Sequence, residues 1–167
     1  MTLTINTDVI RRLRDALLAE AATGAGAQDA HPHRDAALAR VAPFAETMYL
    51  VMIADGRSAP QEIAAVRGAV RLLTRDLLED ADLDRLLDAC AAAASERGAE
   101  VMLQVLGGRL CANRGDRETA FTLAAAVALA DDEVTDSERA LVGDVAEWYG
   151  VSSKRARELL GAMQSTG

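Results

Sequence analysis

The amino-acid sequence predicts an all-α fold, and three observations point to it. Alanine, the strongest helix former, makes up about a fifth of the 167 residues. Aromatic residues contribute only 3% of the chain, and there are three prolines. No stretch shows the alternation of apolar and polar residues that is typical of a half-buried strand. Because half of the residues are hydrophobic, a chain of this length can bury a core as one domain or two tightly packed halves.

Helical periodicity and capping residues divide the chain into about eight helices. The first begins near Asn6 or Thr7, either of which is a good N-cap. The stretch 23–33 that follows this helix is rich in glycine, alanine and polar residues, which is typical of a flexible linker. We therefore separate an N-terminal helix and linker, residues 1–33, from a helical domain, residues 34–167.

The helical domain opens with a helix over 34–54 whose last turn is apolar all round, as expected of an enclosed helix. Pro43 is expected to kink this helix or to mark its true start. The next helix begins at Pro60, because proline is tolerated in a first helical turn. Acidic residues within 76–79 predict the start of a fourth helix, which ends near Gly98.

Four further helices complete the domain. One covers 100–112 and is expected to be weakened by two adjacent glycines, and the next covers 117–130 and is apolar nearly all round. Thr135-x-x-Glu138 matches the capping box that starts a helix. The remaining signals are Gly150, which suits the end of that seventh helix, and Ser152, which suits the start of the eighth.

An internal repeat relates the two halves of the domain. Residues 54–62 (ADGRSAPQE) align without gaps on residues 130–138 (ADDEVTDSE). In each copy an apolar helix ends in Ala-Asp, and a glutamate lies seven residues after the aspartate. The repeats extend over about 44–97 and 118–164. Each half is thus predicted to be a buried central helix, an acidic turn and two amphipathic helices, with the two central helices packed together about a pseudo-twofold axis.

Charge, hydropathy and motif content exclude several functions. The net charge is −8 without a basic stripe, which excludes binding to nucleic-acid phosphates, and no apolar run approaches the length of a membrane span. Cys90 and Cys111 have no zinc or disulfide spacing, and no catalytic motif is visible. We expect a cytoplasmic protein that is not an enzyme. The acidic stretch 76–88 is typical of a solvated helix face, or alternatively of an electrostatic surface for a protein partner.

The acidic turns allow two interpretations. A turn that carries carboxylates and backbone carbonyls supplies the oxygen ligands that calcium or magnesium prefers. The second turn is the better candidate, because five carboxylates lie within eight residues: Asp131, Asp132, Glu133, Asp136 and Glu138. Its spacing is not that of an EF-hand. In the other interpretation the glutamate of each turn lies at the third position of the next helix, where it caps the helix and needs no ligand.

Both copies resemble the repeated signature of the tellurite-resistance TerB-like family, and related domains occur in a membrane-anchored J-domain co-chaperone. The resemblance covers about 44–163. It implies an all-helical fold with two central helices and an internal duplication, in a bacterial cytosolic protein linked to stress or metal resistance. It also implies a divalent-metal site, and the residues carried over are Asp55, Glu62, Asp131 and Glu138, with Glu133 as an addition. The first copy departs from the family pattern, because Ala59 stands where the family has serine or threonine.

We therefore favour a TerB-like, non-enzymatic domain that binds a divalent cation, a protein partner or both through its acidic turns. Calcium or magnesium is expected rather than zinc. A cation held by Asp131, Glu133 and Glu138 would fix the angle between the sixth and seventh helices. The alternative is a purely structural interaction module whose acidic turns only cap helices.

Overall fold

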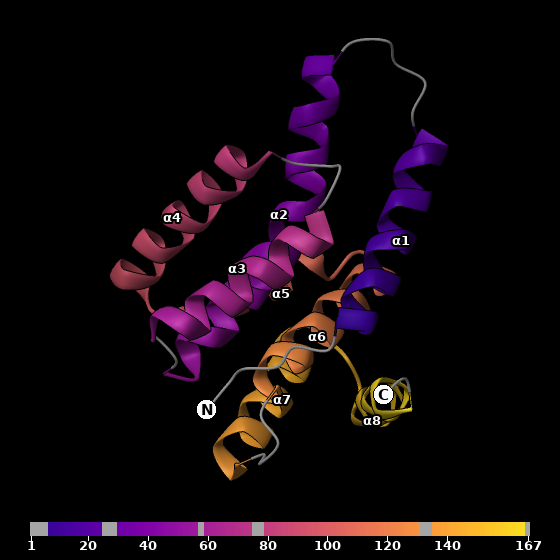
Figure 1. Ribbon diagram of the computed structural model, residues 1–167. Coiled ribbons are helices and arrows are strands. Elements are labelled where there is room, and N and C mark those ends of the chain that lie inside the picture. The colour runs from indigo at the N-terminus through magenta and orange to yellow at the C-terminus, as the bar shows by residue number, and fades with distance from the viewer. Residues whose placement is uncertain (1–6, 25–29, 57–58, 75–78, 131–134, 166–167) are drawn as a thin grey trace.

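The chain folds into a bundle of helices. The computed structural model describes residues 7–24, 30–56, 59–74, 79–130 and 135–165, with the backbone alone over 16–24 and 30–37. These residues form eight helices and no strand, so the all-α prediction is confirmed (Figure 1). The helices are α1 (Thr7–Gly24), α2 (Ala30–Ala54), α3 (Pro60–Thr74), α4 (Asp80–Arg97), α5 (Ala99–Leu110), α6 (Arg114–Ala128), α7 (Asp136–Trp148) and α8 (Ser153–Gln164).

Several predicted boundaries are wrong, each for a local reason. The linker expected over 23–33 is helical at both of its ends, because α1 runs to Gly24 and α2 begins at Ala30. Pro32 does not prevent this, since it lies in the first turn of α2, where proline costs no helical hydrogen bond. Pro43 lies in the interior of α2 and does not mark its start.

The start of α6 also differs from the prediction, by three residues. Helix α6 begins at Arg114 because Asn113 is its N-cap, and the Asn113 side chain accepts a hydrogen bond from the Asp116 N–H at 3.0 Å. Residues 114–116, which precede the helix predicted over 117–130, are therefore already its first turn. As a result Arg114 and Arg117 both lie at the beginning of α6.

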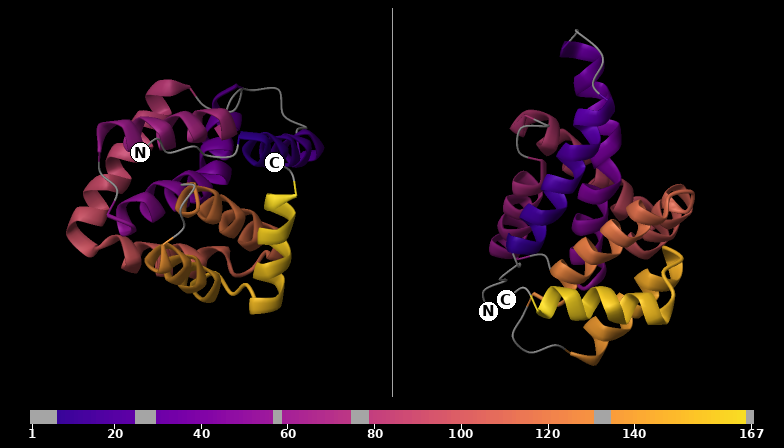
Figure 2. Two further views of the ribbon diagram at one scale, coloured as in Figure 1. Left: turned by 60° about the horizontal axis from the view of Figure 1, so that its bottom comes forward. Right: turned by 90° about the vertical axis from the view of Figure 1, so that its right-hand side faces the viewer.

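Helices α2 and α6 form the centre of the bundle and pack against each other, as predicted (Figure 2). Every residue of α6 from Ala120 to Ala128 is buried. Helices α3 and α4 pack on α2, and helices α7 and α8 pack on α6. Each half is thus a central helix followed by two covering helices, which is the arrangement predicted for each repeat. The small alanine side chains of α6 let these neighbouring backbones approach closely.

Helices α1 and α5 join the two halves. Helix α1 packs against α3 and places Val9 and Ile10 in the buried interior. Helix α5 packs against both α2 and α7. Where α5 meets the end of α7, a Cβ atom added to Gly107 would collide with the carbonyl group of Trp148. Glycine at this position therefore permits the close approach of α5 to α7.

A buried polar contact joins α2 to the end of α7. Tyr149 is fully buried, and its hydroxyl lies 2.7 Å from Thr47 Oγ1. Thr47 Oγ1 donates to the Pro43 carbonyl oxygen at 2.7 Å, one turn earlier in α2, so the tyrosine hydroxyl donates to Thr47. Burial raises the pKa of Tyr149 above its ordinary value. A buried hydroxyl that is hydrogen-bonded in this way fixes the position of α7 on α2.

Candidate functional site

The first acidic turn follows the central helix α2. Asp55 is half-buried after the last residue of α2, and Gly56 adopts a left-handed conformation with a φ of +73°. Helix α3 then starts at Pro60. The carboxylate of Glu62 turns back, and its Oε2 accepts the Ala59 N–H at 3.1 Å. Glu62 therefore caps the first turn of α3.

The second acidic turn is described only from Thr135 onward, so Asp131, Asp132 and Glu133 lie outside the described residues. The predicted capping box at the start of α7 is confirmed. Thr135 Oγ1 accepts the Glu138 N–H at 3.2 Å, and Glu138 Oε2 accepts the Thr135 N–H at 2.9 Å. Glu138 is only 5% exposed, which is rare for a carboxylate and is explained in part by this hydrogen bond.

The two glutamates have equivalent positions in the two halves. Both accept the N–H of the residue that precedes their helix, but Ala59 has no hydroxyl, so the first turn forms only half of the box that Thr135 completes. Within the described part of the chain, no three His, Cys, Asp or Glu side chains gather closely enough to hold a metal ion. Two of the predicted ligands of the second turn are outside that part, so the cation site stays a prediction.

The acidic stretch 76–88 is described over 79–88, where arginines pair with many of its carboxylates. Arg67 of α3 contacts Asp84 at 2.7 Å and Asp88 at 3.2 Å. Arg85, on α4 itself, pairs with an aspartate one turn before it. The contacts from Arg67 join α4 to α3. Because of all these ion pairs, the stretch presents less uncompensated negative charge to a protein partner than the sequence indicates.

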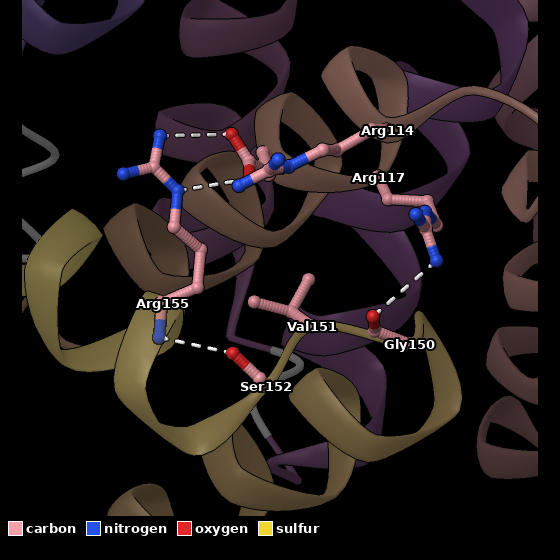
Figure 3. A pocket seen from close by; sticks show the side chains of 7 residues that line it. Arg114, Arg117, Gly150, Val151, Ser152 and Arg155 are labelled. Carbon is pink, nitrogen blue, oxygen red and sulfur yellow. Dashed lines mark hydrogen bonds and ion pairs between the residues drawn. The ribbon is translucent and has the colours of Figure 1, made fainter.

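A second polar site lies where α6 meets the segment between α7 and α8, and the sequence analysis did not identify it. It is a pocket of about 160 Å³, which we call the arginine pocket. Arg155 lies on one side of Val151 and Arg117 on the other (Figure 3). The residues that line the arginine pocket are Arg114, Arg117, Glu118, Gly150, Val151, Ser152 and Arg155.

Glu118 connects α6 to α8 within this pocket. Arg155 donates to it through both arms of the guanidinium group, from Nε to Oε1 at 2.8 Å and from Nη2 to Oε2 at 3.0 Å. Arg114 Nε also donates to Glu118 Oε1 at 3.0 Å. The hydrogen bond from Arg155 is the main cause that lowers the pKa of Glu118, and Glu118 in turn raises the pKa of Arg155. The carboxylate therefore stays ionised and both of its oxygens have partners.

Arg117 is held differently. Its Nη1 donates to the carbonyl oxygen of Gly150 at 3.3 Å, and Gly150 ends α7 with a φ of +69°, as its sequence position predicts. A cation near these last carbonyl groups is favoured by the helix dipole. The Nε atom of Arg117, however, is buried and has no hydrogen-bond partner in the part of the chain that the structure describes. Arg117 is thus a partly buried cation that donates a hydrogen bond to a neutral carbonyl group.

The chain matches the family described as tellurite resistance protein TerB over residues 35–161. It belongs to the TerB family. The match confirms the predicted resemblance and extends from α2 into α8, so it contains both acidic turns and the arginine pocket. No curated protein and no solved structure matches the chain.

The TerB-family domain also has an apolar groove between α6, α7 and α8. Its volume is about 270 Å³, and its lining includes Phe121, Val142 and Leu160. In the part of the chain that the structure describes, no helix has the length and hydropathy needed to cross a bilayer. Two residues of the groove's lining, Leu129 and Arg139, flank the second acidic turn in the sequence.

One sequence signal could have indicated the arginine pocket. Arg114 and Arg117 lie in the first turns of α6, at the positive end of the helix dipole, where cations are disfavoured. Two cations at such a position indicate that acceptors or negative charges lie close to them. The partner of Arg114 is Glu118, one turn later in the same helix. Arg155 is 37 residues away from Glu118, so the contact between these two residues follows only from the packing of α8 on α6.

Proposed function

We propose that this TerB-family chain is a non-enzymatic binding domain that acts in tellurite resistance or a related stress response, and that a divalent cation binds at its second acidic turn. Family membership supports the biological context. The single observation that carries the cation proposal is the position of Glu138. Its side chain is almost fully buried at the start of α7, and four acidic residues precede it within seven positions of the sequence.

The chemistry of the turn explains why a cation would be stabilising. Glu138 is held in place by the Thr135 N–H, so its carboxylate loses little freedom on binding an ion. Like charges as close as Asp131, Glu133 and Glu138 in the sequence raise the cost of keeping all of them ionised, and a hard cation removes that cost. Bound between α6 and α7, the ion would fix the angle of these helices and with it the width of the apolar groove.

The first acidic turn is a weaker candidate for the same chemistry. It offers Asp55 and Glu62, and Glu62 is oriented by the Ala59 N–H as Glu138 is by that of Thr135. It has fewer carboxylates than the second turn, and a basic residue, Arg57, lies between the two. We therefore expect a cation to bind the second turn more tightly than the first.

The test is thermal unfolding of metal-stripped protein titrated separately with calcium, magnesium, manganese and zinc. A ligand that binds only the folded state stabilises it by about 2.7 kcal/mol at roughly 100 times its Kd. We expect a saturable rise in Tm with calcium or magnesium that Asp131→Asn abolishes. Asp144→Asn, which removes an exposed carboxylate from α7, is the matched control and should keep the response. A flat response to all four ions at millimolar concentration would refute the cation site.

A second candidate function is a structural interaction module whose acidic turns only cap helices. The observation that favours it is that Glu62 and Glu138 both accept backbone N–H groups. In this case the protein partner would meet the surface beside the apolar groove. No ion would then change the Tm, and Asp131→Asn and Asp144→Asn would melt alike.

A further inference from the structure

We propose that the arginine pocket binds a small oxyanion of the phosphate class, free or as a phosphomonoester. The first argument is local charge. Three guanidinium groups line the pocket, and Glu118 is the only carboxylate among its lining residues. Both oxygens of Glu118 already accept hydrogen bonds from Arg155 and Arg114. Arg155 also donates to Glu158, outside the lining, at 3.0 Å, so three guanidinium groups face two carboxylates. The pocket therefore keeps an excess of one positive charge in a chain whose net charge is −8.

Arg117 provides the second argument. Among the described residues its buried Nε has no hydrogen-bond partner, and the bond from its guanidinium to the Gly150 carbonyl does not neutralise its charge. A donor or a cation that is taken out of water without a partner costs free energy. An oxyanion in the pocket would supply the negative charge that this guanidinium lacks.

The helices around the pocket provide the third argument. The first N–H groups of a helix have no partner within that helix, and they favour anions. Helix α8 begins at the pocket with Ser152, whose side chain accepts the Arg155 N–H at 3.2 Å and so satisfies one of these groups. Helix α6 begins beside it with Arg114 and Arg117, which are unfavourable at that end of a helix. One anion between the two helix starts would interact favourably with the first N–H groups of α8 and would offset the positive charges at the start of α6.

Size and geometry limit the ligand class. The volume of about 160 Å³ corresponds to roughly five water molecules of the liquid. This suits an inorganic oxyanion or the phosphate end of a larger molecule. Guanidinium groups bind phosphate oxygens through paired N–H donors, so Arg114 and Arg117 are the groups from which we expect direct contacts. Arg155 is already paired with Glu118 and acts as a positioning residue for that carboxylate.

The experiment is a titration of the full chain with inorganic phosphate, followed by the backbone amide shifts at constant ionic strength, with chloride as the reference anion. We expect saturable shifts at Arg117 and over the first turn of α8. Hydrogen bonds to charged groups imply that Arg114→Gln and Arg117→Gln each weaken binding about ten-fold or more. Arg97→Gln, an exposed position on α4, removes the same charge outside the pocket and should change the affinity by less than about two-fold.

Further arms distinguish the sources of the ligand. Sulfate should bind as phosphate does, because the site recognises an oxyanion and not a particular protonation state. Binding of O-phosphoserine as well as inorganic phosphate would support a site that accepts monoesters, and binding of inorganic phosphate alone would support a site for the free anion. Arg114→Gln keeps the test valid if Arg117→Gln does not fold. The absence of saturable shifts, or an equal loss of affinity in Arg97→Gln, would overturn the proposal.

Discussion

Replacing Gly107 with alanine is expected to destabilise the protein, although the same change at Gly108 is expected to stabilise it. Both glycines lie in α5, where alanine is favoured over glycine by about 1 kcal/mol in an exposed helix interior. Gly108 is exposed and nothing lies within 4 Å of an added Cβ, so this gain should be realised. At Gly107 the added Cβ would meet the Trp148 carbonyl group, which belongs to the backbone of α7 and cannot rotate away.

The expected change in the free energy of unfolding combines the gain in helix propensity with the cost of the collision with Trp148. Overpacking in a well-packed interior costs about 1–3 kcal/mol, or more where the contact is to backbone. Gly107→Ala gains the same helix propensity as Gly108→Ala and then loses more than that gain to the collision. We therefore expect a net destabilisation of about 1–2 kcal/mol for Gly107→Ala and a stabilisation of up to about 1 kcal/mol for Gly108→Ala.

Urea unfolding of the two variants beside the wild type measures the difference. The midpoints should move in opposite directions while the slope of the transition stays constant. If Gly107→Ala unfolds at the same or a higher urea concentration than Gly108→Ala, then α5 does not approach α7 as closely as described. The contact between the two halves at this point would have to be revised.

Three further predictions concern caps, pH and the buried hydroxyl. Thr135→Ala should lower the free energy of unfolding in urea by about 1 kcal/mol. Ala59→Ser supplies the missing hydroxyl of the first turn and should raise it by up to about 1 kcal/mol. A loss of stability in Ala59→Ser would contradict the equivalence of the two turns. The pKa of Glu118 is lowered from 4.5, so its ionised form stabilises the folded protein above that pH and this stabilisation is lost as the pH falls below it. Glu118→Gln should therefore destabilise the protein at neutral pH and have a smaller effect in acid. Burial raises the pKa of Glu46, so Glu46→Gln should stabilise the protein at neutral pH and have little effect below pH 4.5. If either variant changes the stability equally at all pH values, the pKa shift assigned to that glutamate is refuted. Tyr149→Phe should cost about 1 kcal/mol, because it removes one hydrogen bond and leaves the threonine hydroxyl bonded to its other partner, whereas an unchanged urea midpoint would argue against that contact.

The sequence predicted those parts of the fold that depend on neighbouring residues. Caps and helix ends follow from groups three or four residues apart, which is why the Thr135 and Glu138 box and the Ser152 cap are confirmed. The central helices were also predictable, because a helix without a polar face has to be enclosed. The helical start of α2 was missed because proline in a first turn resembles proline in a linker when only composition is read.

Contacts between distant residues were not predictable in the same way. Gly107 and Gly108 are equivalent in the sequence, and only the packing of α5 on α7 makes one indispensable. The arginine pocket depends on Arg155 reaching Glu118 from another helix, so neither residue alone marks a site. The acidic residues were prominent in the sequence, but hydrogen bonds and ion pairs within the fold account for Glu138 and for several carboxylates of α4.

The way in which α8 is attached has a consequence for the dynamics of the domain. It lies across the ends of α6 and α7 (Figure 2). Ala156 is its one buried residue, while Leu159, Leu160 and Met163 are only partly buried. Much of its attachment to α6 is therefore the forked ion pair between Arg155 and Glu118. Elements with few buried apolar contacts open in local fluctuations that do not require global unfolding. Helix α8 should thus separate before the central helices do, more readily at high ionic strength, and each opening would expose the apolar groove beneath it.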